Sequence, residues 1–238
     1  MTGHWLRPSY CLGRWGRGMQ GALLCAALLL SLALAHPAHA ADPVEQKLNQ
    51  AGLVDPTRSD PSILLDLRYA TTNNFTGRKV YPSGRCFLRK DVAERLLKVQ
   101  AQLRKQGLGL KLYDCYRPFS VQEAFWRIMP DERYVGRPLR ENGVIIKSSQ
   151  HNRGAAVDLT LVDSQGSELP MPTGFDDFTS AAHRGSAKPG SVAANNAELL
   201  ERVMTAQGFI PLATEWWHFD GPGFERYKPL DLPLPADN

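Results

Sequence analysis

Residues 149–158 read SQHNRGAAVD, and residues 214–220 read TEWWHFD. Each stretch places a histidine near a carboxylate, and the two stretches lie far apart in the chain. In an ideal strand, residues seven apart face opposite sides of the sheet, so His151 and Asp158 share a site only if the backbone turns between them. Gly154 lies in this interval, where glycine adopts unusual backbone conformations at little cost. The sequence therefore predicts a turn at Gly154 that leads into a strand.

Outward from this stretch, strand and helix patterns alternate along the chain. Apolar residues recurring every three to four positions predict amphipathic helices, and SVQE at 120–123 is read as a capping box. The predicted strands cover 62–70, 108–115 and 154–162, and the predicted helices cover 89–106, 120–129 and 192–207. Residues 41–60 are predicted to be a tail, and 71–84, 130–147 and 163–190 to be loops. This order, without a βαβ fingerprint, predicts an α+β domain with a central, mostly antiparallel sheet flanked by helices.

The first forty residues have the pattern of a secretory signal peptide. Three arginines precede the uncharged run GALLCAALLLSLALA at 21–35, and AHA at 38–40 supplies the small residues of a cleavage site. The run is too short to span a bilayer, although an uncleaved membrane anchor remains the alternative. Residues 1–40 are thus predicted to be removed, leaving a single domain over 41–238 in the periplasm or outside the cell.

The charge balance of the remaining chain argues against a nucleic-acid partner. Removal of the three arginines lowers the basic count from 28 to 25 against 24 acidic residues, so the net charge falls from +4 to about +1. No basic block remains that would form a nucleic-acid footprint. No later apolar run is long enough for a membrane helix, so no membrane contact is expected after cleavage. The oligomeric state is not predicted.

Only two cysteines, Cys86 and Cys115, follow the predicted leader. An even pair in an oxidising compartment suggests a disulfide. It would close a loop of roughly thirty residues and stabilise the fold by about 3 kcal/mol in the chain-entropy model. A zinc site built from cysteine and histidine is the alternative, but no CxxC pair supports it.

Two histidines and one carboxylate from the two stretches are suited to a catalytic zinc site. Such sites hold zinc with three nitrogen or oxygen ligands and keep the fourth position for water, and the ion lowers the pKa of that water to about 7. His151, Asp158 and His218 are the predicted ligands, with Glu215 as general base. Glu215 and His218 are three apart, so Glu215 is expected just before the strand that carries His218.

Each of these residues also has a simpler interpretation. A histidine beside an aspartate is commonly a surface pair, and Trp216 and Trp217 are interpreted as packing residues. His183, in the predicted loop 163–190, is expected either at the surface or in contact with a metal ligand, and not to bind the metal itself. Arg117 ends a predicted strand and precedes a proline, a position from which it could stabilise an oxyanion by about 3 kcal/mol. The joint presence of both stretches favours the zinc site over these alternatives.

The motifs together resemble the D-alanyl-D-alanine dipeptidases, the VanX-type zinc peptidases related to D,D-carboxypeptidases and to the Hedgehog-like fold. The pattern SxHxxGxAxD matches at Ser149, His151, Gly154, Ala156 and Asp158, and ExxH matches at Glu215 and His218. Further matches are RYATTNNFTG at 68–77, YRP at 116–118 and GFDDF at 174–178. The resemblance covers nearly the whole chain after the leader, from about residue 60 to 228.

The resemblance implies a role for each matched residue. It implies one Zn²⁺ per chain on His151, Asp158 and His218, with Glu215 as base and Arg117 as oxyanion stabiliser. It also implies that Tyr69, Ser149 and Asp176 surround the amino terminus of a small D,D-dipeptide substrate, although a second acid, Asp177, adjoins Asp176. Cys115 stands where many relatives carry glycine, and its pairing with Cys86 suits an exported form.

Three functions are consistent with these observations. The first is zinc-dependent hydrolysis of D-Ala-D-Ala to two D-alanines. The second is a D,D-carboxypeptidase or endopeptidase that acts on peptidoglycan stem peptides. The third is a zinc-stabilised protein that binds cell-wall peptides without cleaving them, and the presence of Glu215 and Arg117 argues against it because a binding module needs neither a base nor an oxyanion donor.

Overall fold

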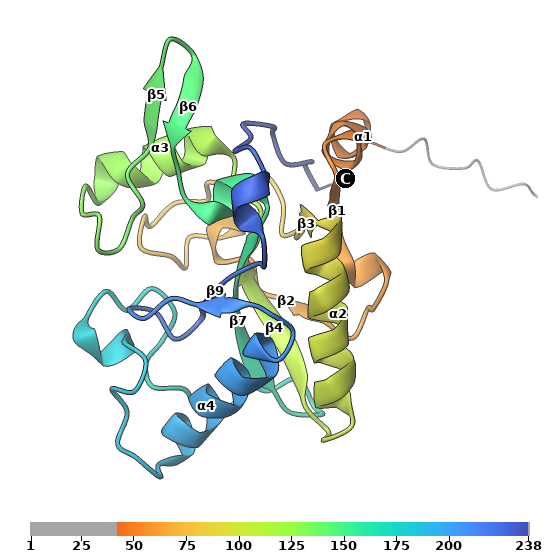
Figure 1. Cartoon of the computed structure of the whole chain (residues 1–238), viewed down its shortest axis with the longest axis vertical. Helices are drawn as coiled ribbons and strands as arrows, with labels where there is room; N and C mark the ends of the chain where they lie inside the picture. The colour runs from red at the N-terminus through yellow and green to blue at the C-terminus, as the bar shows by residue number, and fades with distance from the viewer. Residues whose placement is uncertain (1–41, 238) are drawn as a thin grey trace, which may run out of the picture. The chain divides into compact units, whose positions relative to one another are not determined.

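A five-stranded sheet forms the centre of the fold in the computed structural model, which describes residues 42–237 (Figure 1). The strand order is β2-β4-β7-β9-β8, parallel only between β2 and β4. The strands are β2 (Leu64–Leu65), β4 (Gly109–Asp114), β7 (Ala156–Val162), β8 (Ile210–Pro211) and β9 (His218–Asp220). The mostly antiparallel α+β fold is therefore confirmed. The predicted signal peptide lies outside the described residues, among which no helix is both long and apolar enough to cross a bilayer.

The described range contains four α-helices, α1 (Pro43–Gln50), α2 (Lys90–Arg104), α3 (Phe119–Ile128) and α4 (Val192–Thr205). Of these, α2 and α4 pack against this sheet. Along β7, alternate residues Val157, Leu159 and Leu161 join one hydrophobic core with residues of α2 and α4. Because successive side chains of a strand point to opposite faces, Asp158 lies on the other face, away from these two helices.

Short elements complete the fold. β1 (Leu53–Val54) pairs with β3 (Leu88–Arg89), and β5 (Leu139–Glu141) pairs with β6 (Val144–Lys147) as a hairpin beside α3 in Figure 1. The 3₁₀-helices are η1 (Pro56–Arg58), η2 (Arg68–Ala70), η3 (Gln150–Arg153), η4 (Ser180–Ala182) and η5 (Phe224–Arg226).

Two segments predicted to lack regular structure contain it. The predicted tail includes α1, which begins because the side chain of Asp42 accepts a hydrogen bond from the backbone N–H of Val44 at 2.8 Å and a proline occupies the first turn. The predicted loop 130–147 contains the β5–β6 hairpin. Its turn residues Asn142 and Gly143 have φ of 48° and 80°, as an Asn-Gly hairpin turn requires.

One predicted helix start and the extent of one predicted strand are also wrong. The helix α3 begins at Phe119 with Pro118 at its N-cap and no side-chain cap, so SVQE is not a capping box. The backbone N–H of Ser120 donates instead to Asp231 at 2.8 Å. The predicted strand 62–70 is reduced to β2, because η2 follows and turns the chain toward the pocket described below.

The predicted disulfide is confirmed. Cys86 and Cys115 are bonded, with an S–S distance of 2.09 Å, and both residues are buried. The bond joins the end of β4 to the segment that precedes β3. The alternative, a zinc site that uses these cysteines, is therefore wrong.

Candidate metal centre

The turn before β7 places His151. Ser149 caps η3 by accepting a hydrogen bond from the backbone N–H of His151 at 3.3 Å, and Gly154 ends η3 with a φ of 67°. A side chain at Gly154 would also collide with Leu53, because an added Cβ would lie 2.2 Å from its Cδ2. The predicted turn at Gly154 is confirmed, and it allows His151 and Asp158 to face one site.

The pairing of β7 with β9 places the other two predicted metal ligands, Asp158 and His218. Asp158 stands directly opposite His218 in the antiparallel ladder, so their side chains leave the sheet on the same face. Glu215 lies in the turn before β9, as predicted, and its carbonyl oxygen accepts from the backbone N–H of His218 at 3.4 Å.

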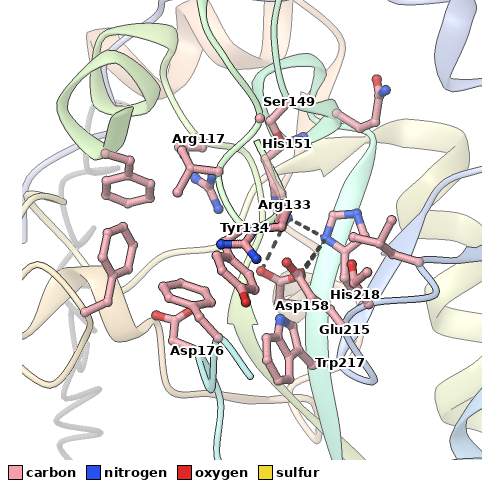
Figure 2. Close-up of a pocket in the computed structure, with 18 of the residues that line it drawn as sticks. Arg117, Arg133, Tyr134, Ser149, His151, Asp158, Asp176, Glu215, Trp217 and His218 are labelled. Carbon is pink, nitrogen blue, oxygen red and sulfur yellow. Dashed lines mark hydrogen bonds and ion pairs between the residues drawn. The ribbon is translucent and has the colours of Figure 1, made fainter. Parts of the chain in front are cut away.

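The three predicted ligands converge in the fold (Figure 2). Nε2 of His151 lies 3.2 Å from Nδ1 of His218. Oδ2 of Asp158 lies 3.3 Å from Nε2 of His151, and Oδ1 of Asp158 lies 2.9 Å from Nδ1 of His218. All three residues are buried.

The outer hydrogen bonds of the two imidazoles determine which nitrogens face inward. Nδ1 of His151 lies 2.7 Å from the carbonyl oxygen of Cys115, which can only accept, so Nδ1 carries the proton. Nε2 of His218 lies 2.9 Å from the carboxylate of Asp220 and donates to it by the same argument. In neutral rings, the lone pairs of the inward nitrogens therefore point at each other and at Asp158. Such a cluster of electron-pair donors is stabilised by a cation between them.

The spacing of these donors fits a zinc ion. In tetrahedral coordination with ligands at about 2.0–2.1 Å, neighbouring ligand atoms are about 3.3 Å apart. The two ring nitrogens are 3.2 Å apart, and they lie 3.3 and 2.9 Å from Oδ2 and Oδ1 of Asp158, respectively. One ligand atom from each of the three residues lies within 4.8 Å of the others. Two imidazole nitrogens and one carboxylate also match the donor types of a catalytic zinc site, in which a fourth position is left for water.

The electrostatics of the cluster favour positive charge at its centre. Burial opposes ionisation of Asp158, but the adjacent His151 and His218 outweigh it and lower the pKa of Asp158. Burial likewise opposes protonation of His218, and its hydrogen bonds to Asp158 and Asp220 reverse this and raise its pKa. The carboxylate is thus held ionised between two nitrogen donors.

Glu215 lies beside the cluster. Its Oε2 is 4.0 Å from Nδ1 of His218, and 12 % of its side chain is exposed. Burial raises the pKa of Glu215 to about 7, and the nearby His218 opposes this rise. A carboxylate in this position can take up and return a proton near neutral pH.

Arg117 lines the same pocket, and its side chain is fixed by hydrogen bonds to Asp114 and Gln122. Its Nε and Nη2 donate to Oδ2 of Asp114 at 3.1 and 2.5 Å, and its Nη1 donates to Gln122 at 2.7 Å. Burial opposes the guanidinium charge, but Asp114 holds the pKa of Arg117 above its usual value. Asp114 was not predicted as part of the site, although its place three residues before Arg117 at a strand end is a usable signal.

Tyr69 and Asp176 meet on the other side of the pocket. The hydroxyl of Tyr69 lies 3.2 Å from both carboxylate oxygens of Asp176. Desolvation raises the pKa of Asp176 to about 8, with Asp158 as the next contributor. The adjacent Asp177 accepts from the backbone N–H and hydroxyl of Thr179 and does not line the pocket. Asp176 is therefore the acid that faces the site.

The irregular segment before α4 supports the site through Arg184 and not through its neighbour His183. His183 is half-buried and lies outside the metal-binding group. Arg184 donates to the carbonyl oxygens of Leu212 and His218 at 2.9 and 2.8 Å, and its guanidinium stacks over the ring of Phe219 at 4.3 Å. It thus holds both ends of the segment that carries Glu215. No pattern in the sequence indicated this role.

The metal-binding residues, Glu215, Arg117, Tyr69 and Asp176 line one cavity of about 430 Å³. Its polar lining includes Tyr69, Arg117, Ser149, His151, Asp158, Asp176, Glu215, His218 and Asp220, together with Glu132, Arg133 and Tyr134 from the loop after α3. The structure therefore brings every predicted metal-binding, catalytic and substrate-binding residue to one pocket. Asp220 is an addition: it lies two residues after His218 on β9, and strand alternation would have identified it.

Comparison with protein families gives a match over most of the chain. Residues 49–231 match the family described as D-ala-D-ala dipeptidase. This range includes all of the residues that line the pocket.

Curated relatives carry the same description. The chain is 37 % identical over 185 residues to a D-alanyl-D-alanine dipeptidase of Escherichia coli, an alignment that covers 78 % of this chain and 90 % of the relative. It is 33 % identical over 184 residues to one from Enterococcus faecalis, covering 71 % and 87 %. A third, from Streptomyces coelicolor, is 34 % identical over 168 residues, covering 65 % and 83 %.

Proposed function

This chain belongs to the D-ala-D-ala dipeptidase family, and from that premise we propose that it is a zinc-dependent dipeptidase that hydrolyses D-Ala-D-Ala to two D-alanines. The observation that carries the proposal is the cluster of His151, Asp158 and His218 beside Glu215. It combines two ring nitrogens and a carboxylate, close enough to share one ion, with a second carboxylate placed to move a proton.

His151, Asp158 and His218 would hold one zinc ion per chain. When bound, the ion supplies a Lewis acid and a water nucleophile usable at neutral pH. Glu215 takes the proton of the attacking water and returns it to the leaving nitrogen, for which its position beside the ligands is suited. Arg117, fixed by Asp114 and Gln122, directs N–H groups at the oxygen on which negative charge develops.

The opposite side of the pocket supplies the group that a free dipeptide needs. An ammonium group is bound by a carboxylate and by hydroxyl acceptors, and Asp176 with Tyr69 offers both. Ser149 lines the same pocket next to His151. We assign these three residues to the substrate's amino terminus, which leaves the peptide bond between Arg117 and Glu215.

The decisive experiment is incubation of the purified, zinc-loaded protein with D-Ala-D-Ala, N-acetyl-D-Ala-D-Ala and L-Ala-L-Ala. Release of D-alanine from the free D,D-dipeptide, with much slower cleavage of the acetylated compound, is the expected result. Preference for the acetylated compound would instead indicate a D,D-carboxypeptidase of stem peptides. Binding of these peptides to the protein without cleavage of any of them would indicate a binding protein.

Asp176→Asn is expected to raise thermal stability and to lower activity. The folded-state pKa of Asp176, about 8, exceeds its ordinary value of 3.8, so ionisation lowers the stability of the folded state increasingly as pH rises from about 4 to about 8. Asparagine removes this cost and accepts the positive φ of 59° at this position. Above pH 8, where Asp176 is ionised, loss of its charge should reduce kcat/KM for D-Ala-D-Ala about 10- to 100-fold.

The measurement is Tm at pH 6 and pH 8 together with kcat/KM. The advantage in Tm of the Asp176→Asn variant should widen at the higher pH. Asp177→Asn serves as the matched control, because Asp177 does not line the pocket. A variant at Asp176 with parental kcat/KM would contradict the assigned role.

Asp220→Ala is expected to weaken zinc binding about 10- to 100-fold, because Asp220 orients the ring of His218 and fixes its proton on Nε2. Competition with a chelator of known affinity measures the zinc dissociation constant directly. The exposed Asp237→Ala provides the control. Unchanged zinc affinity in the Asp220 variant would exclude this positioning role.

We also propose that the protein acts in the periplasm or outside the cell. The pattern of residues 1–40 and the disulfide between Cys86 and Cys115 support this location, because disulfides persist in oxidising compartments. Mass spectrometry of the protein secreted by its natural host would test it: the expected amino terminus lies near residue 41.

A further inference from the structure

Four aromatic rings stand in series along one side of the pocket. Tyr69 meets Phe75 edge to face with centroids 6.1 Å apart, and Phe75 meets Phe178 in the same way at 5.3 Å. Phe178 then stacks on Tyr134, with centroids 5.1 Å apart and planes inclined by 27°. All four residues line the cavity. We call Tyr69, Phe75, Phe178 and Tyr134 the aromatic wall.

The aromatic wall lies at the same end of the pocket as Asp176. Tyr69, its first member, contacts both carboxylate oxygens of Asp176. Phe178 follows Asp176 by two residues in the same irregular segment. In Figure 2, Asp176 and Tyr134 appear to the left of the metal-binding residues Asp158 and His218.

The outer part of the wall joins segments that are distant in the sequence. Phe178 comes from the irregular segment after β7, whereas Tyr134 comes from the loop after α3. Both rings are half-buried, unlike the buried Tyr69. Truncation of either outer ring therefore opens the pocket to solvent and removes little of the core.

This arrangement has a consequence for substrate length, which rests on the proposed function. If the ammonium group of a dipeptide is bound at Asp176, a residue added before it needs space beyond Asp176, and the aromatic wall lines the cavity at that end. We infer that the stacked pair of Phe178 and Tyr134 determines specificity by blocking this direction, so that peptides extended at the amino terminus are rejected. In such a longer peptide the nitrogen placed at Asp176 is an uncharged amide, so loss of the charge at that position and a steric barrier act against the same substrates.

The test compares kcat/KM for D-Ala-D-Ala-D-Ala and D-Ala-D-Ala in the zinc-loaded parent and in the variants Phe178→Ala and Tyr134→Ala. In both variants, the ratio of tripeptide to dipeptide activity is expected to rise roughly tenfold or more, as for removal of a steric block in a binding pocket. Tyr134→Phe keeps the ring and should reject the tripeptide as the parent does. Trp126→Ala removes a half-buried aromatic of α3 that does not line the pocket, and it should leave the ratio unchanged.

The outcomes separate this inference from the proposed function. A parent that cleaves the dipeptide, with an unchanged ratio in both alanine variants, would overturn the inference and leave the proposed function in place. A parent that cleaves the tripeptide as well as the dipeptide would also overturn it. A parent that cleaves neither would refute the proposed function and this inference with it. If Phe178→Ala does not fold, as judged by its Tm, Phe178→Leu provides the same comparison without the ring.

Discussion

Removal of zinc with a chelator is expected to abolish hydrolysis of D-Ala-D-Ala and to lower the Tm of the protein. His151, Asp158 and His218 hold two inward ring nitrogens and a carboxylate within one buried cluster, and a ligand that binds only the folded state stabilises it. Zinc at a hundred times its dissociation constant stabilises the folded state by about 2.7 kcal/mol. For a chain of this size, that corresponds to roughly 5–10 °C in Tm.

Activity and Tm measured through a cycle of chelation and zinc addition check this prediction, and both should return on addition. Two histidine variants supply the matched comparison. His151→Ala should lose bound zinc and activity together, whereas His183→Ala should keep both because His183 lies outside the cluster. Full activity of the chelated protein, verified to be zinc-free, would rule out the proposed mechanism.

Glu215→Gln is expected to bind zinc as the parent does and to hydrolyse D-Ala-D-Ala about 10²- to 10⁴-fold more slowly. Glutamine has the shape of glutamate but cannot take up the proton of the attacking water. Glu215 is not among the three metal-binding residues, so the substitution leaves the donors of the ion intact. Loss of turnover without loss of metal is therefore the signature of a general base.

The measurements are kcat and the zinc content of the purified variant. Glu198→Gln, on the exposed face of α4, is the control for the loss of a negative charge. A kcat within a few-fold of the parent would remove Glu215 from its assigned role. Loss of zinc in the same variant would show that the residue supports the metal and does not act on the substrate alone.

Several features of the site were predictable because they depend on neighbours in the sequence. Gly154 follows a histidine and precedes an apolar run, so a turn into a strand was expected there, and the φ of 67° confirms it. The α2 helix was evident from its apolar spacing. The Asn142-Gly143 pair of the β5–β6 turn is also a local signal, since an Asn-Gly pair favours a two-residue hairpin turn. The loop predicted over 130–147 is therefore an error that the sequence itself could have prevented.

The sequence by itself determined the chemical types available: after residue 40 it contains three histidines and two cysteines, and only a few acids adjoin them. The tertiary structure alone decided that Asp158 stands opposite His218, that the carbonyl of Cys115 orients His151, and that Phe178 stacks on Tyr134. The reason is physical. Local backbone preferences follow from adjacent residues, whereas contacts between distant segments require loop closure and are selected by the packing of the whole core.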